Sequence, residues 1–429
     1  MGILLVLLAL FVAFALGVPV AYALGLAALA GAWYIGIPPE AVMLQISSGI
    51  SKFAMLTIPF FVLAGAIMAE GGMARRLVAL ANVIVGLARI RGGLSAVNVL
   101  ATTFMSGISG SAIADTSAIG SVMIPQMEES GYPRVFATNV TISSSVQALL
   151  VPPSHNAVIY SLATGGTISV IALFMAGVVP GLLLGASLIV LCLVIARRDN
   201  HPRGVAVPMG EAIRTAASAF WGLVTIVIII GGILSGVFTA TEAGAIACVW
   251  AFCVTMFVYR DYRWRDLPML AYRTMRTVAM VMTLIAMAAS VGYIMALMQM
   301  PAHVTAFFLT LSHNKYVILM MINILLLVFG CFMDMAPSIL IATPILLPVM
   351  VGFGVDPVHF GIIMMLNLVI GLCHPPVGSI IFVGCAVGKV RMEEVFPQML
   401  PFYAVMFAVL ALVTYVPELS LWLPRLLHL

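Results

Sequence analysis

Uninterrupted apolar runs, each long enough to cross a lipid bilayer, recur from the beginning to the end of this 429-residue sequence. Soluble domains contain about 45–50% apolar and about 25% charged residues, whereas this chain has 63% hydrophobic and 8% charged residues. That composition excludes a soluble enzyme and a disordered chain. The runs are continuous rather than alternating, which favours helices over strands. The sequence therefore predicts an all-α polytopic membrane protein.

Charge and motifs narrow the class further. The net charge of +4, from 19 basic and 15 acidic residues, does not suggest a nucleic-acid partner. No GxxxxGKS or GxxxxGKT motif occurs, so no P-loop for ATP hydrolysis is expected. Residues 1–17 lack a basic segment and predict a first membrane helix rather than a cleaved signal peptide. Six cysteines without a CxxC pair are expected to be reduced and buried: Cys192, Cys248, Cys253, Cys331, Cys373 and Cys385.

Most basic residues gather in clusters, which the positive-inside rule assigns to the cytoplasmic face. The four clusters are Arg75, Arg76, Arg89 and Arg91; Arg197, Arg198, Arg203 and Arg214; Arg260, Arg263, Arg265, Arg273 and Arg276; and Lys389 with Arg391. The second cluster lies in a polar linker, residues 197–214, which is the best candidate for a boundary between two halves. The linker is therefore expected to be cytoplasmic.

Counting spans between the clusters gives a consistent path across the membrane. The predicted spans are 3–17, 18–36, 54–73, 135–163, 167–196, 219–238, 240–258, 277–299, 358–388 and 402–423. The path requires 94–127 and 317–350 each to enter and leave on one side, as re-entrant helical hairpins. Both termini are then periplasmic.

The two halves repeat each other at an offset of 223 residues. This offset carries Pro125 onto Pro348, and the pair Pro152-Pro153 onto Pro375-Pro376. The basic stretch 260–276 corresponds to residues 37–53, which contain few charges, so equivalent loops lie on opposite faces and the repeats are inverted. Inverted repeats with interrupted helices are typical of secondary transporters. The expected divisions are 1–196 (scaffold 1–93, hairpin and broken helix 94–196), the linker 197–214, and 215–429 (scaffold 215–315, hairpin and broken helix 316–400, C-terminal helix 401–429).

Each half contains an oxygen-rich hairpin segment and an oxygen-rich break. The first half has Ser106–Ser117 and Ser143–Asn156, and the second has Gly330–Pro344 and Asn367–Ser379. Hydroxyl, carbonyl and carboxylate oxygens are the ligands that a hard cation such as Na⁺ prefers.

The two hairpin segments each contain one acid, Asp115 and Asp334. A carboxylate within a membrane costs roughly 2.5–3.5 kcal/mol on insertion scales, which favours a functional role. The alternative is a helix cap or an inter-helix hydrogen bond. The serines could equally be packing residues between membrane helices.

Other polar side chains have weaker interpretations. His155 and His374 flank the proline pairs, where they could relay protons, contact substrate or simply form ordinary hydrogen bonds. Glu242 is expected to be buried in a scaffold hydrogen bond. The 29 methionines are expected to pack rather than bind a transition metal, since no ligand spacing accompanies them.

Several motifs together resemble one family. They are SGISGSAIADTSAIGSVMIP, VPPSHNAVIY, GVFTATEAG, MDMAPSILIATPILLP and HPPVGS. In order and spacing, over essentially the whole chain, they are similar to the large membrane (M) subunit of tripartite ATP-independent periplasmic (TRAP) transporters. More distantly, the paired hairpins resemble those of sodium-coupled dicarboxylate transporters.

The resemblance implies Na⁺-coupled import of a small organic acid across the bacterial inner membrane, with no enzymatic activity. It implies a soluble periplasmic binding protein that delivers the substrate, and a small four-helix membrane subunit that is expected to be a separate chain. It also implies an elevator motion, in which hairpins and broken helices move against a static scaffold. Na⁺ is the expected coupling ion, at two sites, with no transition metal and no organic cofactor.

Matching the family's motifs assigns candidate residues. The sodium-site candidates are Ser109, Ser111, Asp115, Ser144 and Pro152 in the first half, and Asp334, Ser338, Thr343, Gly371 and Pro375 in the second. The substrate-site candidates are Ser117, Ser154, Asn156, Gly378 and Ser379. No Arg or Lys lies in either hairpin or break, so helix N-termini would meet the substrate's acid group. Monocarboxylates, dicarboxylates, acidic sugars and keto acids all remain open.

Two rival functions stay open at this point. One is a self-sufficient Na⁺- or H⁺-coupled dicarboxylate carrier that needs no binding protein. The other is an intramembrane hydrolase that pairs Ser109 or Ser154 with His155. Adjacent residues at a broken helix do not establish that catalytic geometry, and hydrolysis does not need inverted repeats.

Overall fold

The computed structural model describes residues 2–88, 90–202, 208–375 and 378–429. Within these ranges the chain is all-helical, and eight helices are long and apolar enough to cross a membrane. The first half contains α1 (Gly2–Ala15), α2 (Val20–Ile35), α3 (Pro39–Ile50), α4 (Thr57–Glu70), α5 (Met73–Ala88), α6 (Gly93–Ser109), α7 (Ala112–Glu129), α8 (Arg134–Ser145), α9 (His155–Ala163) and α10 (Val170–Arg198). The second contains α11 (Met209–Leu234), α12 (Ala240–Cys253), α13 (Leu267–Leu297), α14 (Met300–Leu311), α15 (Lys315–Phe332), α16 (Met335–Gly352), α17 (Pro357–Leu372), α18 (Ser379–Gly388), α19 (Met392–Tyr415) and α20 (Glu418–Leu426).

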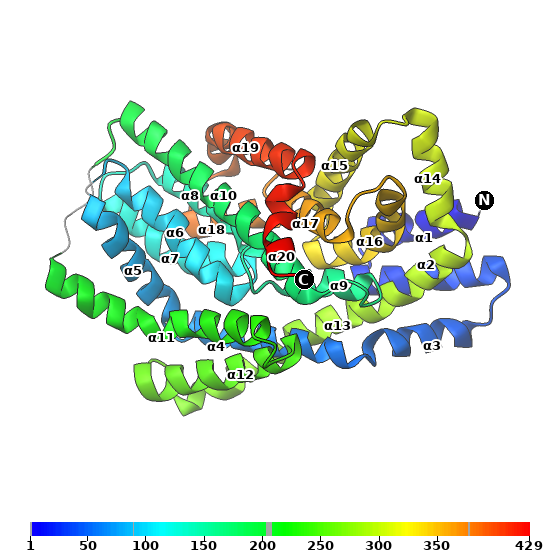
Figure 1. Ribbon diagram of the computed structural model, residues 1–429, viewed down its shortest axis with the longest axis horizontal. Coiled ribbons are helices and arrows are strands. Elements are labelled where there is room, and N and C mark those ends of the chain that lie inside the picture. Colours follow the sequence, from blue (N-terminus) through cyan, green and yellow to red (C-terminus); the bar gives the residue numbers. More distant parts are fainter. Residues whose placement is uncertain (1, 89, 203–207, 376–377) are drawn as a thin grey trace.

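The helices form two layers. In Figure 1, α3, α4, α11, α12 and α13 run along one side of the molecule, and the helices α6–α10 and α15–α20 lie above them. Helix α13 packs against α2, α3 and α4 in the first layer and against α16 in the second. We call the layer formed by α1–α5 and α11–α14 the scaffold layer, and the other the hairpin layer.

Two helical hairpins occur where the sequence predicts them, over 94–127 and 317–350. The pairs are α6–α7 and α15–α16, and the offset of 223 relates Ala112 to Met335 and Glu129 to Gly352 at the two ends of their second helices. Gly110 closes the first turn with a φ of +60°, a conformation that glycine adopts without steric cost.

Two helices are interrupted at the predicted proline pairs. Helix α8 continues through a 3₁₀ turn at Val146–Leu149 to a break at residues 150–154, after which α9 begins. Helix α17 ends at Leu372 and α18 begins at Ser379. The predicted residue Pro376 lies outside the described part of this second break. Each predicted span, 135–163 and 358–388, is therefore a pair of shorter helices.

The halves exchange equivalent contacts. Helix α7 packs against α18, and its counterpart α16 packs against α9, the counterpart of α18. The same exchange relates α4–α12 to α13–α2, and α10–α17 to α19–α8. Such reciprocal pairing is what an approximate two-fold axis between two similar halves produces.

The basic clusters contact one another on a single face. Arg76 forms an ion pair with Asp261, and Arg273 pairs with Glu70 at 3.1 Å. Arg91 donates to Asn200 at 3.0 Å, which joins the first cluster to the linker. The predicted members Arg89 and Arg203 lie outside the described residues. The gathering of these clusters agrees with one membrane face carrying most of the positive charge.

Some segments differ from the sequence expectation. Residues 37–53 and 300–315, interpreted as loops, contain the helices α3 and α14. Both have 12 residues, fewer than the about 20 needed to cross a bilayer, so counting spans misses them. Helix α13 extends through Arg273 and Arg276, and α11 begins at Met209, inside the expected linker.

Two predictions of burial are wrong. Cys253 is exposed and Cys331 is half-buried, while the other four cysteines are buried as expected; all six are free thiols. Glu242 is exposed rather than buried. It forms a capping box with Thr239, whose backbone N–H donates to the Glu242 carboxylate at 2.8 Å, so its hydrogen bond is local to the start of α12.

Candidate functional site

A cavity of about 350 Å³ lies between the two layers, where the tips of both hairpins meet. On the scaffold side it is lined by α4 and by the N-terminal half of α13; on the hairpin side, by the two tips and the start of α9. Four predicted site residues line it, from both halves of the sequence: Ser109, Ser111, Asn156 and Asp334. His155 lines it as well. The structure thus brings together residues that lie up to 225 positions apart.

Asp115 is fully buried behind the first tip, where serine hydroxyls surround it. Ser106 donates to Oδ2 of Asp115 at 3.0 Å, and Ser109 donates to Oδ1. Thr102 accepts from Ser106 through its carbonyl and contacts the Ser144 hydroxyl at 3.1 Å. The predicted residues Ser109, Asp115 and Ser144 therefore belong to one polar network. Sequence reasoning missed the two residues that connect it, Thr102 and Ser106.

The first hairpin is seated directly on the first helix break. A Cβ atom added to Gly107 would lie 3.1 Å from the carbonyl oxygen of Pro152, and one added to Gly110 would lie 3.0 Å from Nδ1 of His155. These close approaches leave room for glycine alone without a shift of the neighbours. They place the predicted residue Pro152, and His155, against the tip that carries Ser109.

At the second tip, Asp334 caps α16. Its Oδ1 accepts from the backbone N–H of Met335 at 2.8 Å, and its carbonyl oxygen accepts from the Ser338 hydroxyl at 2.9 Å. Asp334 is exposed toward the cavity that it lines. The cap alternative from the sequence therefore describes part of its role, and one carboxylate oxygen, Oδ2, makes no protein hydrogen bond among the described residues.

The other residues assigned to the second sodium site are dispersed. Thr343 lies nine residues after Asp334, about 13 Å along the same helix, and its hydroxyl contacts the sulfur of Met364 at 3.5 Å. Gly371 packs against Gly330 where α17 meets α15. The carbonyl oxygen of Pro375 accepts from Nδ1 of His374 at 2.8 Å. Asp334 and Ser338 are together; the structure does not bring Thr343 to them.

The residues assigned to substrate are likewise divided. Asn156 lines the cavity and is buried. Ser154 is buried beside it at the start of α9, and its hydroxyl has no hydrogen-bond partner within the described ranges. Ser117 is exposed on α7 two turns from the tip, and Gly378 and Ser379 begin α18, outside the set of residues that line the cavity.

The electrostatics of the cavity come from helix ends. Helices α7, α9 and α16 all begin at its edge, through Ser111, His155 and Asp334. A helix N-terminus carries unpaired N–H groups and about half a positive charge, which favours anions. No Lys or Arg is among the described residues that line the cavity. The arrangement offers oxygen ligands for a cation and partial positive charge for an acid group.

Sequence reasoning also missed the scaffold wall of this cavity. It consists of Val62, Gly65, Ala66 and Ala69 from α4 and Thr277, Met280 and Val281 from α13. Small residues three and four positions apart on α4 were the available signal, but the same spacing marks ordinary helix packing.

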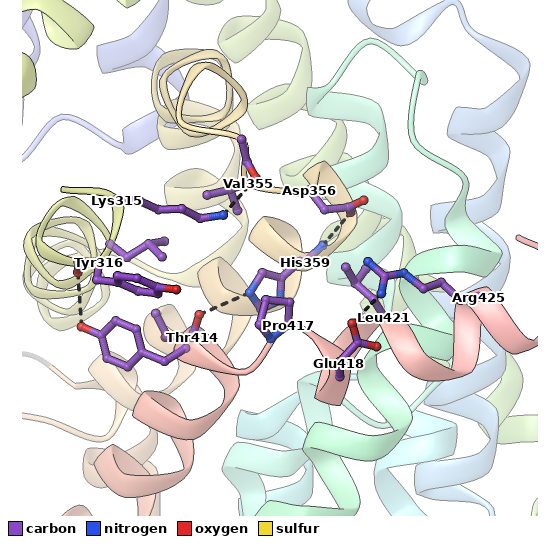
Figure 2. Close-up of a pocket in the computed structure, with 13 residues that line it drawn as sticks. Lys315, Tyr316, Val355, Asp356, His359, Thr414, Pro417, Glu418, Leu421 and Arg425 are labelled. Atoms are coloured by element: carbon purple, nitrogen blue, oxygen red, sulfur yellow. Dashed lines mark hydrogen bonds and ion pairs between the residues drawn. The ribbon is translucent and has the colours of Figure 1, made fainter. Parts of the chain in front are cut away.

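A separate cavity of about 270 Å³ lies between α15, α17, α19 and α20, and Figure 2 shows its lining. Its charged groups are already paired: Lys315 donates to the Gly354 carbonyl at 3.0 Å, Arg425 pairs with Glu418 at 2.5 Å, and Asp356 caps α17 at 2.8 Å from the Val358 N–H. These contacts hold α20 against the hairpin layer, and we assign no ligand to this cavity.

Comparison with known proteins decides the family. Residues 7–419 match the family described as "Tripartite ATP-independent periplasmic transporter, DctM component". The chain belongs to this family. It is the large permease component of a transporter rather than an enzyme, as the sequence resemblance implies.

Similar curated proteins align over nearly the full length. The chain is 42% identical to the uncharacterized protein YgiK of Salmonella typhimurium, covering 96% of this chain and 94% of that protein. It is 38% identical to the C4-dicarboxylate TRAP transporter large permease protein DctM of Rhodobacter capsulatus, covering 96% of each. Among solved structures, the Alcanivorax borkumensis YdaH transporter aligns with a TM-score of 0.60 at 15% identity, covering 87% of each chain. That likeness extends to the fold alone.

Proposed function

We propose that this permease imports a small organic acid across the bacterial inner membrane in symport with Na⁺. The observation that carries the proposal is the convergence of both hairpin tips on one cavity between the layers, with three helix N-termini and the carboxylate of Asp334 at its edge. The helix ends favour the acid group. The oxygen-rich tips favour the hard cation.

Na⁺ is assigned to the two tips. At the first, the Asp115 carboxylate with the Ser106 and Ser109 hydroxyls forms a set of hard donors. At the second, Asp334 has a carboxylate oxygen directed to the cavity, with Ser338 one turn away. Because a cation at either tip would lie beside the cavity, its charge would attract the substrate's carboxylate, which couples the two bindings.

The substrate class follows from size and charge. A cavity of about 350 Å³ has the volume of a small metabolite site. The Rhodobacter relative is named for C4-dicarboxylates, so succinate is the first probe. Acidic sugars and keto acids remain in the panel because no Arg or Lys among the described lining residues selects one acid.

The transport cycle is assigned to movement of the hairpin layer past the scaffold layer, with the two halves as inverted repeats. The exchanged contacts between the halves and the position of the cavity at the layer boundary support this elevator mechanism. The family's tripartite description supports two further components. We assign these to a small four-helix membrane subunit and a periplasmic binding protein.

The test is uptake by proteoliposomes that contain this chain with the small subunit, supplied outside with the binding protein. The labelled probes are succinate, N-acetylneuraminate and pyruvate. We expect one of them to accumulate only with an inward Na⁺ gradient and with the binding protein present. Accumulation without the binding protein would favour a self-sufficient carrier instead, and accumulation driven by a proton gradient without Na⁺ would overturn the assigned coupling ion.

A further inference from the structure

A second cavity, of about 220 Å³, lies elsewhere on the boundary between the layers. Its wall on α13 corresponds, residue for residue, to the wall of the first cavity on α4. The first wall consists of Val62, Gly65, Ala66 and Ala69, and the second of Ile285, Ala288, Ala289 and Gly292. Each member of the second set follows its counterpart by 223 positions. The scaffold layer therefore presents the same surface twice.

The remaining scaffold wall obeys the same relation. In the first cavity it is the N-terminal half of α13, represented by Thr277. In the second it is the segment from the end of α3 to the following 3₁₀ turn, represented by Gly49, Lys52 and Met55. The offset carries residues 49–55 onto 272–278, directly beside Thr277.

The hairpin layer meets the two cavities at different points along the same two helices. Helices α9 and α16 begin at the first cavity, with Asn156 and Asp334, and pass the second, with Ala163 and Leu340. They pack against each other, and α16 packs against α13 (Figure 1). Six or seven residues of helix separate the contact points, about 10 Å at 1.5 Å per residue. Sliding the hairpin layer by that distance would bring both tips to the second wall.

The first cavity lies toward the face with the basic clusters. Its residue Ala69 is next to Glu70, which pairs with Arg273, and Thr277 is one turn from Arg273. The positive-inside rule assigns that face to the cytoplasm. The second cavity lies farther along α13, on the side from which a periplasmic substrate would come.

Charge distinguishes the two cavities. Lys52 lines the second and is the sole Lys or Arg among the described residues that line either one. The offset places Met275 at the equivalent position of the first scaffold surface. An ammonium group on one side alone would hold an anion more strongly there than on the other.

We propose that the second cavity is the uptake-side half of the substrate site, and that Lys52 binds the substrate's carboxylate there. This inference rests on the proposed import of an organic acid. In the uptake position the tips face Ile285–Gly292, and Lys52 completes the site. After the slide the tips face Val62–Ala69, where helix ends alone hold the acid, so its release to the cytoplasm is favoured.

The positional part of the proposal is tested by cross-linking. Ile113 lines the first cavity at the tip, and Ala66 and Ala289 are equivalent positions of identical size. We expect Ile113→Cys to cross-link with Ala66→Cys and, in a separate double variant, with Ala289→Cys, in a background whose six native cysteines are replaced by alanine. Full complexes in membrane vesicles are treated with a short bifunctional thiol reagent. A cross-link to position 66 alone, under every gradient, would overturn the second position of the tips.

The chemical part is tested by transport kinetics, which do not depend on the cysteine-free background. For the probe that wild type imports, we expect Lys52→Gln to raise KM about tenfold with little change in kcat, and Lys52→Arg to restore most of the affinity. Lys315→Gln is the matched control, since Lys315 lies at neither cavity. Unchanged KM in Lys52→Gln, or equal effects in the Lys315 control, would refute the role of Lys52. Absence of Na⁺-driven uptake in wild type would instead refute the proposed function.

Discussion

Ser111 and Asp334 occupy equivalent positions in the two hairpins, 223 residues apart, and each accepts a hydrogen bond from the first turn of the helix that follows. One turn further on, Asp115 and Ser338 are also equivalent. The carboxylate and the hydroxyl have therefore exchanged places between the halves. One acid is buried among serines, and the other is exposed to the cavity.

This exchange separates the capping role of Asp334 from a role in binding Na⁺. Serine is also a good N-cap residue, and it is the residue that the first hairpin has at this position. We expect Asp334→Ser to leave the unfolding temperature of the complex unchanged and to weaken Na⁺-dependent uptake about tenfold or more. Uptake with an unaltered Na⁺ dependence would limit Asp334 to its cap.

For Asp115, the informative change is Asp115→Asn. The amide keeps the shape of the side chain and can still accept hydrogen bonds from Ser106 and Ser109, but the charge is removed. We expect the protein to fold and Na⁺-driven accumulation to be lost. Asp199→Asn, on the exposed linker segment, is the control and should transport normally. Equal activity in the two variants would contradict the sodium assignment.

Glycine at position 330 is predicted to be required for packing. A Cβ atom there would lie 2.6 Å from the Leu368 carbonyl oxygen and 3.0 Å from Cα of Gly371. Since these are backbone atoms, Gly330→Ala should destabilise the protein by about 1–3 kcal/mol. Gly352→Ala has no neighbour within 4 Å and should change stability by less than about 1 kcal/mol. Unfolding in detergent, followed by tryptophan fluorescence, compares the two; equal stability would show that α15 and α17 can separate freely.

His201 gives a pH-dependent prediction outside the membrane. Its ring is buried, with ring centroids 5.0 Å from Tyr132 and 4.8 Å from Phe136. Burial lowers the pKa of His201, an effect that nearby Asp199 partly opposes. Because the folded state disfavours the charged ring, its stability is complete above the unfolded pKa of about 6.5 and falls as the pH drops below it. We expect the unfolding temperature to fall less from pH 8 to pH 5.5 in His201→Phe than in wild type. Identical decreases would exclude His201 as the cause.

The membrane orientation can be tested by labelling single cysteines. Arg263, in a basic cluster, and His313, between α14 and α15, are both exposed. We expect Arg263→Cys to react with a membrane-impermeant thiol reagent only from the cytoplasm, and His313→Cys only from the periplasm. A tag at Leu429 should be accessible from the periplasm. Labelling of both cysteines from one side would contradict the inverted repeats.

The hairpins and breaks could be predicted from the sequence because prolines, glycines and acids within apolar runs are rare and therefore conspicuous. Asp115, Ser109 and Ser144 could be grouped for the same reason. Thr343 was misplaced because its distance from Asp334 depends on the helix continuing unbroken through Pro337 and Pro344, which composition does not reveal. Ala66 and Ala289 carry no chemical signal, and only the packing of the two layers shows that they form cavity walls.

The exchanged packing of α7 with α18 and of α9 with α16 has a consequence for biosynthesis. The ribosome completes α7 about 250 residues before α18 emerges, so the first hairpin, with Asp115, enters the membrane without its final neighbour. The insertion machinery or a chaperone must shelter that polar tip until the C-terminal half arrives. A nascent chain stopped within α12 should therefore be a preferred substrate for membrane proteases.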